Sequence, residues 1–421
     1  MEENPIMPIK RKRGRPSKAD QLEKDGQSNF FKLLIDSPEA RANLKSMLAA
    51  SSIDVNWRGM VATPPGTLLE TVVEAFKSRT NIPLEIPFFA VMHFLSQHLL
   101  KEEISIDFKG NRINPDLWNV VLAPSGASKS FTTNSIKKML DAPDGFPEPA
   151  SAAKFIDNMQ VYNREGWIQD EFGKFLANLD LPHLMELKSY LLKTYDGIKI
   201  ERHTMKSQTV IDSPALSIFG LTVLENFTDE LPTGSLVDGF AQRFSYVIAE
   251  RDPDRKMKDF PIFHFDGFDE QIKKEWADLL NSVHHKTYYI GQEAEEAYIN
   301  AFKRMIPDFE SIDESFYRRI LWRGTRYALL YHILQKKDSP ELDAVDMGWA
   351  ARVLQMHLKD ACRLITEHNL PHLARILEAC QRVVEKIELT EGRKAKPRDL
   401  VHGVHGINRV SEAQAYMHLL H

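Results

Sequence analysis

Residues 118–130 read Trp-Asn-Val-Val-Leu-Ala-Pro-Ser-Gly-Ala-Ser-Lys-Ser. The apolar run 120–122 predicts a buried strand, residues 123–128 predict a loop, and a polar, amphipathic run continues over 131–140. A buried strand, a loop of small residues and a helix start, in this order, form the context that a phosphate-binding P-loop requires. The stretch therefore predicts a phosphate site at the start of a helix.

This loop supplies the candidate nucleotide ligands. Backbone N–H groups at the helix start would face the phosphates, Lys129 would reach the β- and γ-phosphates, and the Ser130 hydroxyl would hold Mg²⁺. We therefore expect ATP and Mg²⁺ as cofactors. The candidate cofactor-binding residues are Ser125, Gly126, Ala127, Ser128, Lys129, Ser130 and Phe131.

The residue before the lysine departs from the usual pattern, because Ser128 stands where a P-loop usually has glycine. If this position needs a positive φ, a serine costs roughly 1–2 kcal/mol there. A penalty of that size would weaken nucleotide binding about tenfold without abolishing it.

An acidic pair follows the next apolar run. Residues 166–171 read Gly-Trp-Ile-Gln-Asp-Glu, so a predicted strand ends in Asp170 and Glu171. In nucleotide-hydrolysing P-loop proteins, a strand beside the P-loop strand ends this way; the aspartate binds Mg²⁺ and the glutamate polarises the attacking water. The alternative is ordinary surface charge. Because the pair follows a P-loop-like stretch, we favour Asp170 as a metal ligand and Glu171 as a catalytic residue.

Two further residues are candidates for catalysis. Thr222 ends the buried run 214–222, where its hydroxyl would sense the γ-phosphate or orient the water; capping the next turn is the alternative. Arg243 precedes the β-type run 245–249 and would neutralise transition-state charge, in cis or across a subunit interface. A structural salt bridge is the alternative for Arg243.

The N-terminal residues 1–28 are polar and charged, which predicts a disordered tail. Within it, 13–16 reads Arg-Gly-Arg-Pro and resembles an AT-hook, whose arginines lie in a narrow A·T-rich minor groove. Flanking lysines would contact phosphate. The alternatives are a solvated basic tail or a nuclear-import signal. The candidate DNA-binding residues are Lys12, Arg13, Gly14, Arg15, Pro16 and Lys18.

Charge and composition limit the class of protein. The net charge is −5, and removing the six basic residues of 10–18 leaves −11 on the rest, so a basic tail joins an acidic body. Cys362 and Cys380 lie in helical patterns, which indicates a reducing compartment and no thiolate metal site. No apolar segment follows the N-terminal charges, and polar residues interrupt the apolar run 86–100. We therefore expect no secretory signal, no membrane span and a cytoplasmic protein, nucleoid-associated if bacterial.

The chain divides by pattern into five parts. The predicted organisation is a basic tail (1–28), a helical domain (29–105), a P-loop NTPase core (106–255), a second helical domain (256–392) and a helix-turn-helix-like segment (393–421).

Several motifs fall in one order after the P-loop-like stretch: Asp-Glu-Phe-Gly from Asp170, Tyr-Asp-Gly from Tyr195, the run 214–222, and Gly-Phe-Ala-Gln-Arg-Phe around Arg243. This order resembles the YfjI-like family of P-loop ATPases, carried mainly by prophages, plasmids and related mobile elements. The resemblance covers roughly residues 60–390. It implies an α/β fold with a RecA/AAA-like P-loop NTPase core between helical N- and C-terminal regions, often suspected of acting as a replicative helicase.

Carried over by position, the resemblance assigns Lys129 and Ser130 to phosphate and Mg²⁺, Asp170 and Glu171 to the acidic strand end, and Arg243 to the family arginine. The leading hypothesis is an ATP-dependent, helicase-like motor of a mobile genetic element that acts on DNA as a homo-oligomer. The alternative is a DNA-binding adaptor or regulator that binds nucleotide as a switch with little or no hydrolysis. Ser128 favours the alternative.

Overall fold

The computed structural model describes much of the chain from residue 62 onward, with short gaps. The described residues are 62–179, 181, 184–203, 208–224, 227, 239–252, 263–305, 314–364, 370–404, 407 and 409–420. The tail 1–28, with its AT-hook-like residues 12–18, lies outside them.

A four-stranded parallel sheet forms the centre of the fold, with strand order β4-β7-β3-β8. Its strands are β3 (Trp118–Ala123), β4 (Glu165–Gln169), β7 (Leu216–Val223) and β8 (Ser245–Ile248). Every residue of β3 is buried, as expected for a parallel strand covered on both faces. The predicted α/β class is confirmed. The acid-bearing strand β4 is not beside β3, however, because β7 lies between them.

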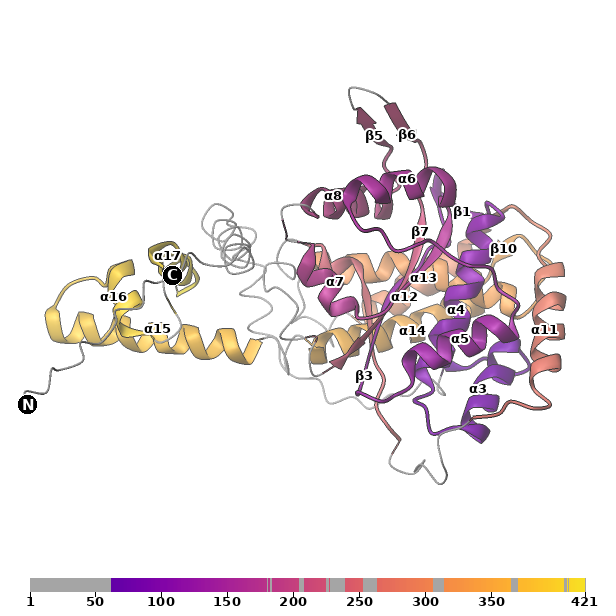
Figure 1. Cartoon of the computed structure of the whole chain (residues 1–421), viewed down its shortest axis with the longest axis horizontal. Helices are drawn as coiled ribbons and strands as arrows, with labels where there is room; N and C mark the ends of the chain where they lie inside the picture. Colours follow the sequence, from indigo (N-terminus) through magenta and orange to yellow (C-terminus); the bar gives the residue numbers. More distant parts are fainter. Residues whose placement is uncertain are drawn as a thin grey trace, which may run out of the picture.

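Helices cover both faces of this sheet (Figure 1). One face packs on α4 (Glu85–Lys101), α13 (Glu314–Leu334) and α14 (Ala344–Arg363). There Phe219 of β7 stacks on His93 of α4, with 5.5 Å between ring centroids. The other face packs on α7 (Phe172–Asn178) and α8 (Met185–Tyr195). There the rings of Trp118 of β3 and Tyr195 of α8 have their centroids 5.0 Å apart. The sheet is therefore the middle layer of three.

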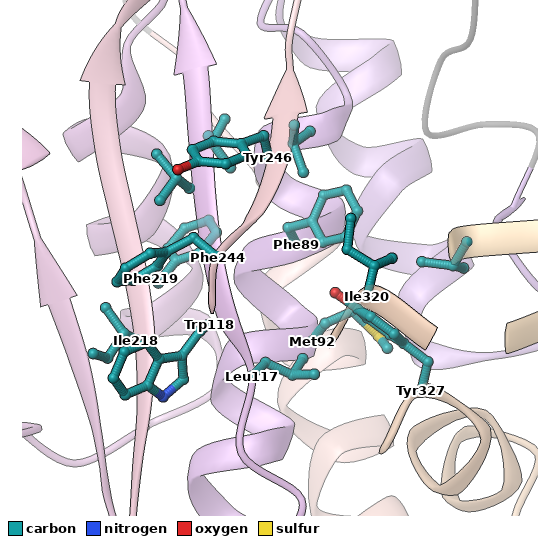
Figure 2. Packing of buried hydrophobic residues seen from close by; sticks show 14 of the residues in the cluster. Phe89, Met92, Leu117, Trp118, Ile218, Phe219, Phe244, Tyr246, Ile320 and Tyr327 are labelled. Atoms are coloured by element: carbon teal, nitrogen blue, oxygen red, sulfur yellow. The ribbon is translucent and has the colours of Figure 1, made fainter. Parts of the chain in front are cut away.

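The core joins strands to helices directly. Figure 2 shows Trp118, Phe219 and Tyr246 from the sheet together with Phe89 of α4 and Tyr327 of α13. All five side chains are at most 1% exposed. Burying aromatic side chains of this size stabilises a fold by about 1.5–3 kcal/mol each, so this cluster fixes how the helices sit on the sheet.

Other helices complete the body. They are α3 (Leu68–Arg79), α5 (Lys129–Met139), α6 (Ala152–Tyr162), α11 (Asp269–Asn281) and α12 (Gln292–Met305), with a short 3₁₀ helix η2 (Ala241–Arg243) before β8. Among the described residues, no helix has the length and apolar character needed to cross a bilayer.

A second, mixed sheet has the order β10-β9-β1-β2. Its strands are β1 (Ser105–Phe108), β2 (Asn111–Ile113), β9 (Thr287–Ile290) and β10 (Glu341–Leu342). Strand β1 pairs with β2 as an antiparallel hairpin and with β9 in parallel. Strand β1 precedes the strands of the central sheet in the sequence and β9 follows them, so the second sheet pairs two segments that are far apart in the chain. A separate hairpin, β5 (Ile200–His203) and β6 (Gln208–Ile211), projects from the body (Figure 1).

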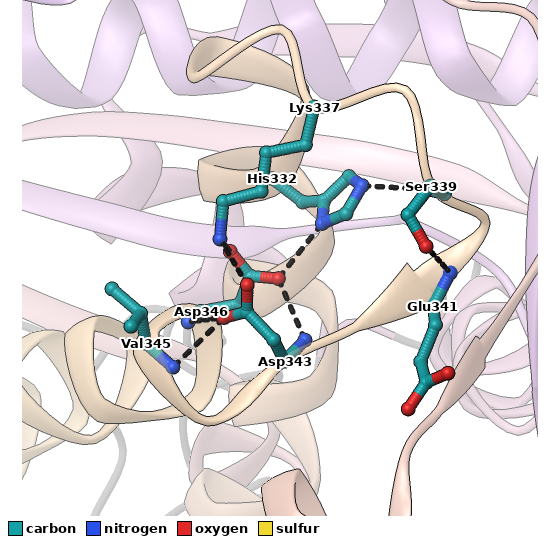
Figure 3. Close-up of polar contacts among 7 residues, drawn as sticks. All are labelled: His332, Lys337, Ser339, Glu341, Asp343, Val345 and Asp346. Carbon is teal, nitrogen blue, oxygen red and sulfur yellow. Dashed lines mark hydrogen bonds and ion pairs between the residues drawn. The ribbon is translucent and has the colours of Figure 1, made fainter.

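Buried charges join the end of α13 to the start of α14 (Figure 3). His332 Nδ1 lies 2.8 Å from Asp346 Oδ2, and its Nε2 lies 2.7 Å from the Ser339 carbonyl. Both ring nitrogens are therefore engaged, one by a carboxylate that is fully buried and one by a backbone carbonyl. Lys337 Nζ completes the network at 2.7 Å from Asp346 Oδ1. Removing one partner of such a pair typically costs about 3–5 kcal/mol.

The last three helices, α15 (Leu370–Glu391), α16 (Pro397–Gly403) and α17 (Val410–Leu420), pack on one another. Figure 1 shows them apart from the layers around the central sheet. Within them, α16 and α17 occupy the segment for which the sequence predicts a helical pair.

Candidate functional site

The β3–α5 loop, residues 124–128, connects the carboxyl end of β3 to the first residue of α5. It begins with a hydrogen-bonded turn, in which the Ala127 N–H donates to the Pro124 carbonyl at 3.2 Å. Gly126 has φ +73° in the third position of this turn, where type II turns require glycine. Ser128 then takes φ 56° and ψ 37°, a left-handed conformation. Ser128 therefore has the positive φ on which the expected cost of a serine at this position depends.

Ser130 and Asp170 meet at the edge of the sheet. The Ser130 Oγ donates to Asp170 Oδ2 at 2.5 Å, although the residues stand 40 positions apart. Ser130 lies in the first turn of α5, and Asp170 follows the last residue of β4. Parallel strands put their carboxyl ends at one edge, and this geometry brings the two oxygen ligands together across the intervening β7. The structure thus joins the two residues that the sequence assigns to the metal.

The residues after Asp170 are fixed by β7. The ring of Phe172 packs directly on Gly220 of β7, where an added Cβ would lie 2.5 Å from its Cγ. The Gly173 N–H donates to Thr222 Oγ1 at 3.3 Å. Two contacts with one strand therefore place the start of α7, and any side chain at Gly220 would displace it.

Glu171 stands directly before these two contacts, between Asp170 and Phe172. It has φ 49°, and its N–H donates to Asp170 Oδ1 at 2.9 Å. Its carboxylate is largely exposed and forms a salt bridge of 2.6 Å with Lys174. The backbone position is held closely, while the carboxylate is tied to a neighbouring lysine within α7.

Thr222 is buried and faces α7 rather than open solvent. Its hydroxyl accepts from the helix start, so it acts as a cap for α7, a helix that precedes it in sequence. The sequence offered sensing of the γ-phosphate or capping of the next turn. Thr222 does act as a cap, but it caps the start of α7 and not the turn that follows Thr222. The hydroxyl retains its own proton for donation.

Arg251 also lies at the carboxyl edge of the sheet, and the sequence analysis did not predict it as a site residue. It follows β8, and its Nη2 donates to the Ser125 carbonyl at 2.8 Å. A Cβ at Gly126 would lie 3.3 Å from the same Nη2, so the guanidinium rests directly on the loop. A signal was available, because a residue just after a parallel strand belongs to the same edge as the β3–α5 loop.

Arg243 lies at the opposite edge of the sheet. It precedes β8, whose first residue, Ser245, pairs with Asn119 near the start of β3. The rise along β3 separates this edge from the β3–α5 loop by about 20 Å. Arg243 Nη2 forms a salt bridge of 3.1 Å with Asp196, and its Nη1 donates to the Gly239 carbonyl at 3.0 Å. The structural salt bridge is therefore present, and contact with the loop of the same chain is not.

The donor set at the carboxyl edge fits Mg²⁺ and phosphate. Mg²⁺ prefers hard oxygen ligands and takes one or two protein ligands besides water and phosphate oxygens. Ser130 and Asp170 supply a hydroxyl and a carboxylate at hydrogen-bond distance. Within the described ranges, no cluster of three or more His, Cys, Asp or Glu side chains forms an alternative metal site.

A cavity of about 590 Å³ lies on the second sheet, lined among others by Lys101, Glu103, Arg112 and Lys286. No residue of the β3–α5 loop lines it. Lys286 pairs with Glu102 at 2.9 Å and holds the pKa of that carboxyl below its usual value. Its charges are balanced largely among themselves, so we assign it no ligand.

No protein-family model matches the chain, and a search of curated proteins finds no match. The resemblance to the YfjI-like family therefore stays a prediction from the motifs. The geometry of the carboxyl edge stands without it.

Proposed function

We propose that the chain is a P-loop ATPase with a RecA/AAA-like core that binds ATP and Mg²⁺ at the carboxyl edge of the central sheet. The observation that carries the proposal is the contact of Ser130 with Asp170 at the mouth of the β3–α5 loop. Four parallel strands end at this edge, and β3 is flanked by strands added on both sides, β7 and β8. Such a switch point is where open α/β sheets bind ligands.

The chain's residues have separate roles in this proposal. Loop N–H groups and Lys129, the first residue of α5, contact the phosphates, and Arg251 holds the loop through the Ser125 carbonyl. Mg²⁺ on Ser130 and Asp170 would neutralise charge on the β- and γ-phosphate oxygens. Glu171, in the next position, polarises the attacking water once it leaves Lys174.

We further propose that this ATPase acts on DNA as a motor of a mobile element and as a homo-oligomer. Support comes from the Arg-Gly-Arg-Pro sequence of 13–16 and from the order of motifs shared with the YfjI-like family. In an oligomer, Arg243 would reach the nucleotide of a neighbouring copy, because its own loop lies at the other edge of the sheet.

A specific observation favours the second candidate, a nucleotide-dependent switch with little hydrolysis. The Glu171 carboxylate is engaged by Lys174 at 2.6 Å, and Ser128 carries backbone strain in the loop. A glutamate held in an ion pair is a poorer base for water.

Steady-state ATP hydrolysis, with and without A·T-rich duplex, separates the candidates. For the motor we expect turnover that DNA stimulates and that falls at least about a hundredfold in Glu171→Gln, with ATP still bound. Glu270→Gln, at an exposed position of α11, is the matched control. Bound ATP without turnover in the wild type, with hydrolysis gained in Lys174→Ala, would establish the switch. Failure of ATP to bind at all rejects both.

A further inference from the structure

Three arginines gather at the amino edge of the central sheet. Arg243 lies in η2, and Arg319 and Arg323 lie one turn apart on α13. The guanidinium carbons of Arg243 and Arg323 lie 5.3 and 5.8 Å from the centre of the Tyr195 ring. Arg319 reaches the same place, since a Cβ on Gly239 would lie 3.0 Å from its Nη1.

The cluster contains more positive than negative charge. Among the described residues, Arg243 forms an ion pair with Asp196, whose carboxylate lies 3.1 Å from Arg243 Nη2. Arg319 donates instead to the neutral Gln242 side chain, and Arg323 donates to Ser245 Oγ at 2.7 Å. In the part of the chain that the structure describes, three guanidinium groups against one carboxylate leave a surplus of two charges.

Among the described residues, a further acid that interacts electrostatically with Arg323 does not balance this surplus. Asp116 is buried and pairs with a fourth arginine, Arg326, at 3.3 Å. Burial raises the pKa of Asp116, and Arg326 opposes that rise. Including this pair leaves the surplus of the cluster unchanged.

Burial makes the surplus costly. Desolvation, followed by the nearby charge of Arg243, lowers the pKa of Arg319. Arg323 is 1% exposed, and the Nε atoms of Arg243 and Arg323 are buried without a hydrogen-bond acceptor. Buried charges in proteins are normally paired, and unsatisfied guanidinium donors indicate a missing anionic partner.

We propose that Arg243 and Arg319 form a second anion site that takes a terminal phosphate group, with Arg323 behind them as a positioning residue. A phosphate monoester dianion matches the surplus of two charges and the fork geometry of guanidinium donors. Arg243 and Arg319 are partly exposed and make the contact, whereas Arg323 holds Gln242 and Ser245 in place. This site lies at the opposite edge of the sheet from the β3–α5 loop of the same chain, and it rests on the proposed function only in that a neighbouring copy's nucleotide is one source of the phosphate.

The test uses the full chain carrying Lys129→Ala, which weakens phosphate binding at the β3–α5 loop. Inorganic phosphate is titrated by calorimetry at constant ionic strength, and ATP is then used as competitor. We expect phosphate to bind the Lys129→Ala protein and the affinity to fall about tenfold or more with Arg319→Met added. Arg318→Met, at the exposed neighbouring position on α13, is the matched control and leaves the affinity unchanged.

Stability in chloride alone separates this role from a structural one. Arg319→Met removes a repelled cation, so the variant is expected to unfold at the same or a higher denaturant concentration than the parent. A lower midpoint together with unchanged phosphate affinity overturns the proposal, as does duplex DNA binding that inorganic phosphate cannot compete. Competition by ATP shows that nucleotide supplies the phosphate; its absence leaves free phosphate as the ligand. Either result supports the site, and neither requires ATP hydrolysis at the β3–α5 loop of the same chain.

Discussion

The Ser130 hydroxyl lies 2.5 Å from the Asp170 carboxylate, which joins the first turn of α5 to the end of β4 across an intervening strand. The Ser130 hydroxyl donates and the Asp170 carboxylate accepts, so the two oxygen atoms lie next to each other. Ser130 would hold a divalent cation through a lone pair of its hydroxyl oxygen, which keeps its proton, and Asp170 would hold it through its carboxylate. This pair is therefore where the proposed role of the site is tested most directly.

Ser130→Ala should reduce ATP affinity about tenfold or more in the presence of Mg²⁺ and leave Mg²⁺-free binding unchanged, because the hydroxyl serves the metal. Equilibrium titration with ATP, with and without Mg²⁺, measures both. Ser135→Ala, on the same helix, is the control and should bind like the wild type. An equal loss in both conditions would assign Ser130 to the fold of the loop instead.

Arg251→Ala should weaken ATP binding about threefold to tenfold, because the loop loses its hydrogen bond from the guanidinium to the Ser125 carbonyl. The side chain is exposed, so the free energy of unfolding should change by less than about 0.5 kcal/mol. Nucleotide titration and urea unfolding check the two parts. Arg382→Ala, exposed on α15, serves as control. Full affinity in Arg251→Ala would remove Arg251 from the site.

Local features of the site could be predicted from sequence, because they depend on neighbouring residues. The apolar run 120–122 is within β3, and Ser128 has the positive φ on which the expected cost of a serine depends. Strand order was not predictable in this way. The insertion of β7 beside β3 depends on contacts between residues about a hundred positions apart, and β9 pairs with the distant β1 in a region whose pattern is otherwise helical.

The edge at which each arginine lies follows from strand direction rather than from motif order. Arg243 comes before β8 and Arg251 comes after it, so a parallel sheet places them at opposite edges. The motif containing Arg243 drew attention to the residue that lies far from the loop. The contact of Asp196 with Arg243 shows that two motifs of the resemblance meet each other, which spacing alone could not reveal.

Thr222→Val should lower the free energy of unfolding by about 1–3 kcal/mol, because the buried Gly173 N–H loses its acceptor. Since this bond fixes the start of α7 next to Glu171, ATP turnover should fall more than ATP affinity. Thr222→Ser keeps the hydroxyl and should restore turnover. Urea unfolding and single-turnover hydrolysis supply the readouts. Equal activity of the Val and Ser variants would show that the hydroxyl has no catalytic consequence.

Ser128→Gly should raise the free energy of unfolding by roughly 0.5–1 kcal/mol. A left-handed serine costs about 1–2 kcal/mol, and the greater freedom of glycine in the unfolded chain offsets part of the gain. Ser128→Ala retains the Cβ and is the matched control, with no gain expected. Urea unfolding of the three proteins checks this. The same stabilisation in both variants would mean that the hydroxyl, and not backbone strain, is responsible.

Two buried histidines should make the fold sensitive to acid. Burial lowers the pKa of His93 and of His357 to about 3, from an ordinary value of 6.5. The unfolded chain therefore binds protons below 6.5 that the folded chain refuses, and stability falls as the pH drops from 6.5 toward 3. Each histidine contributes up to about 1.4 kcal/mol per pH unit. In urea unfolding at several pH values, His93→Leu should reduce this slope by about one proton, whereas exposed His203→Leu should not. An unchanged slope in His93→Leu would show that His93 is protonated in the folded protein.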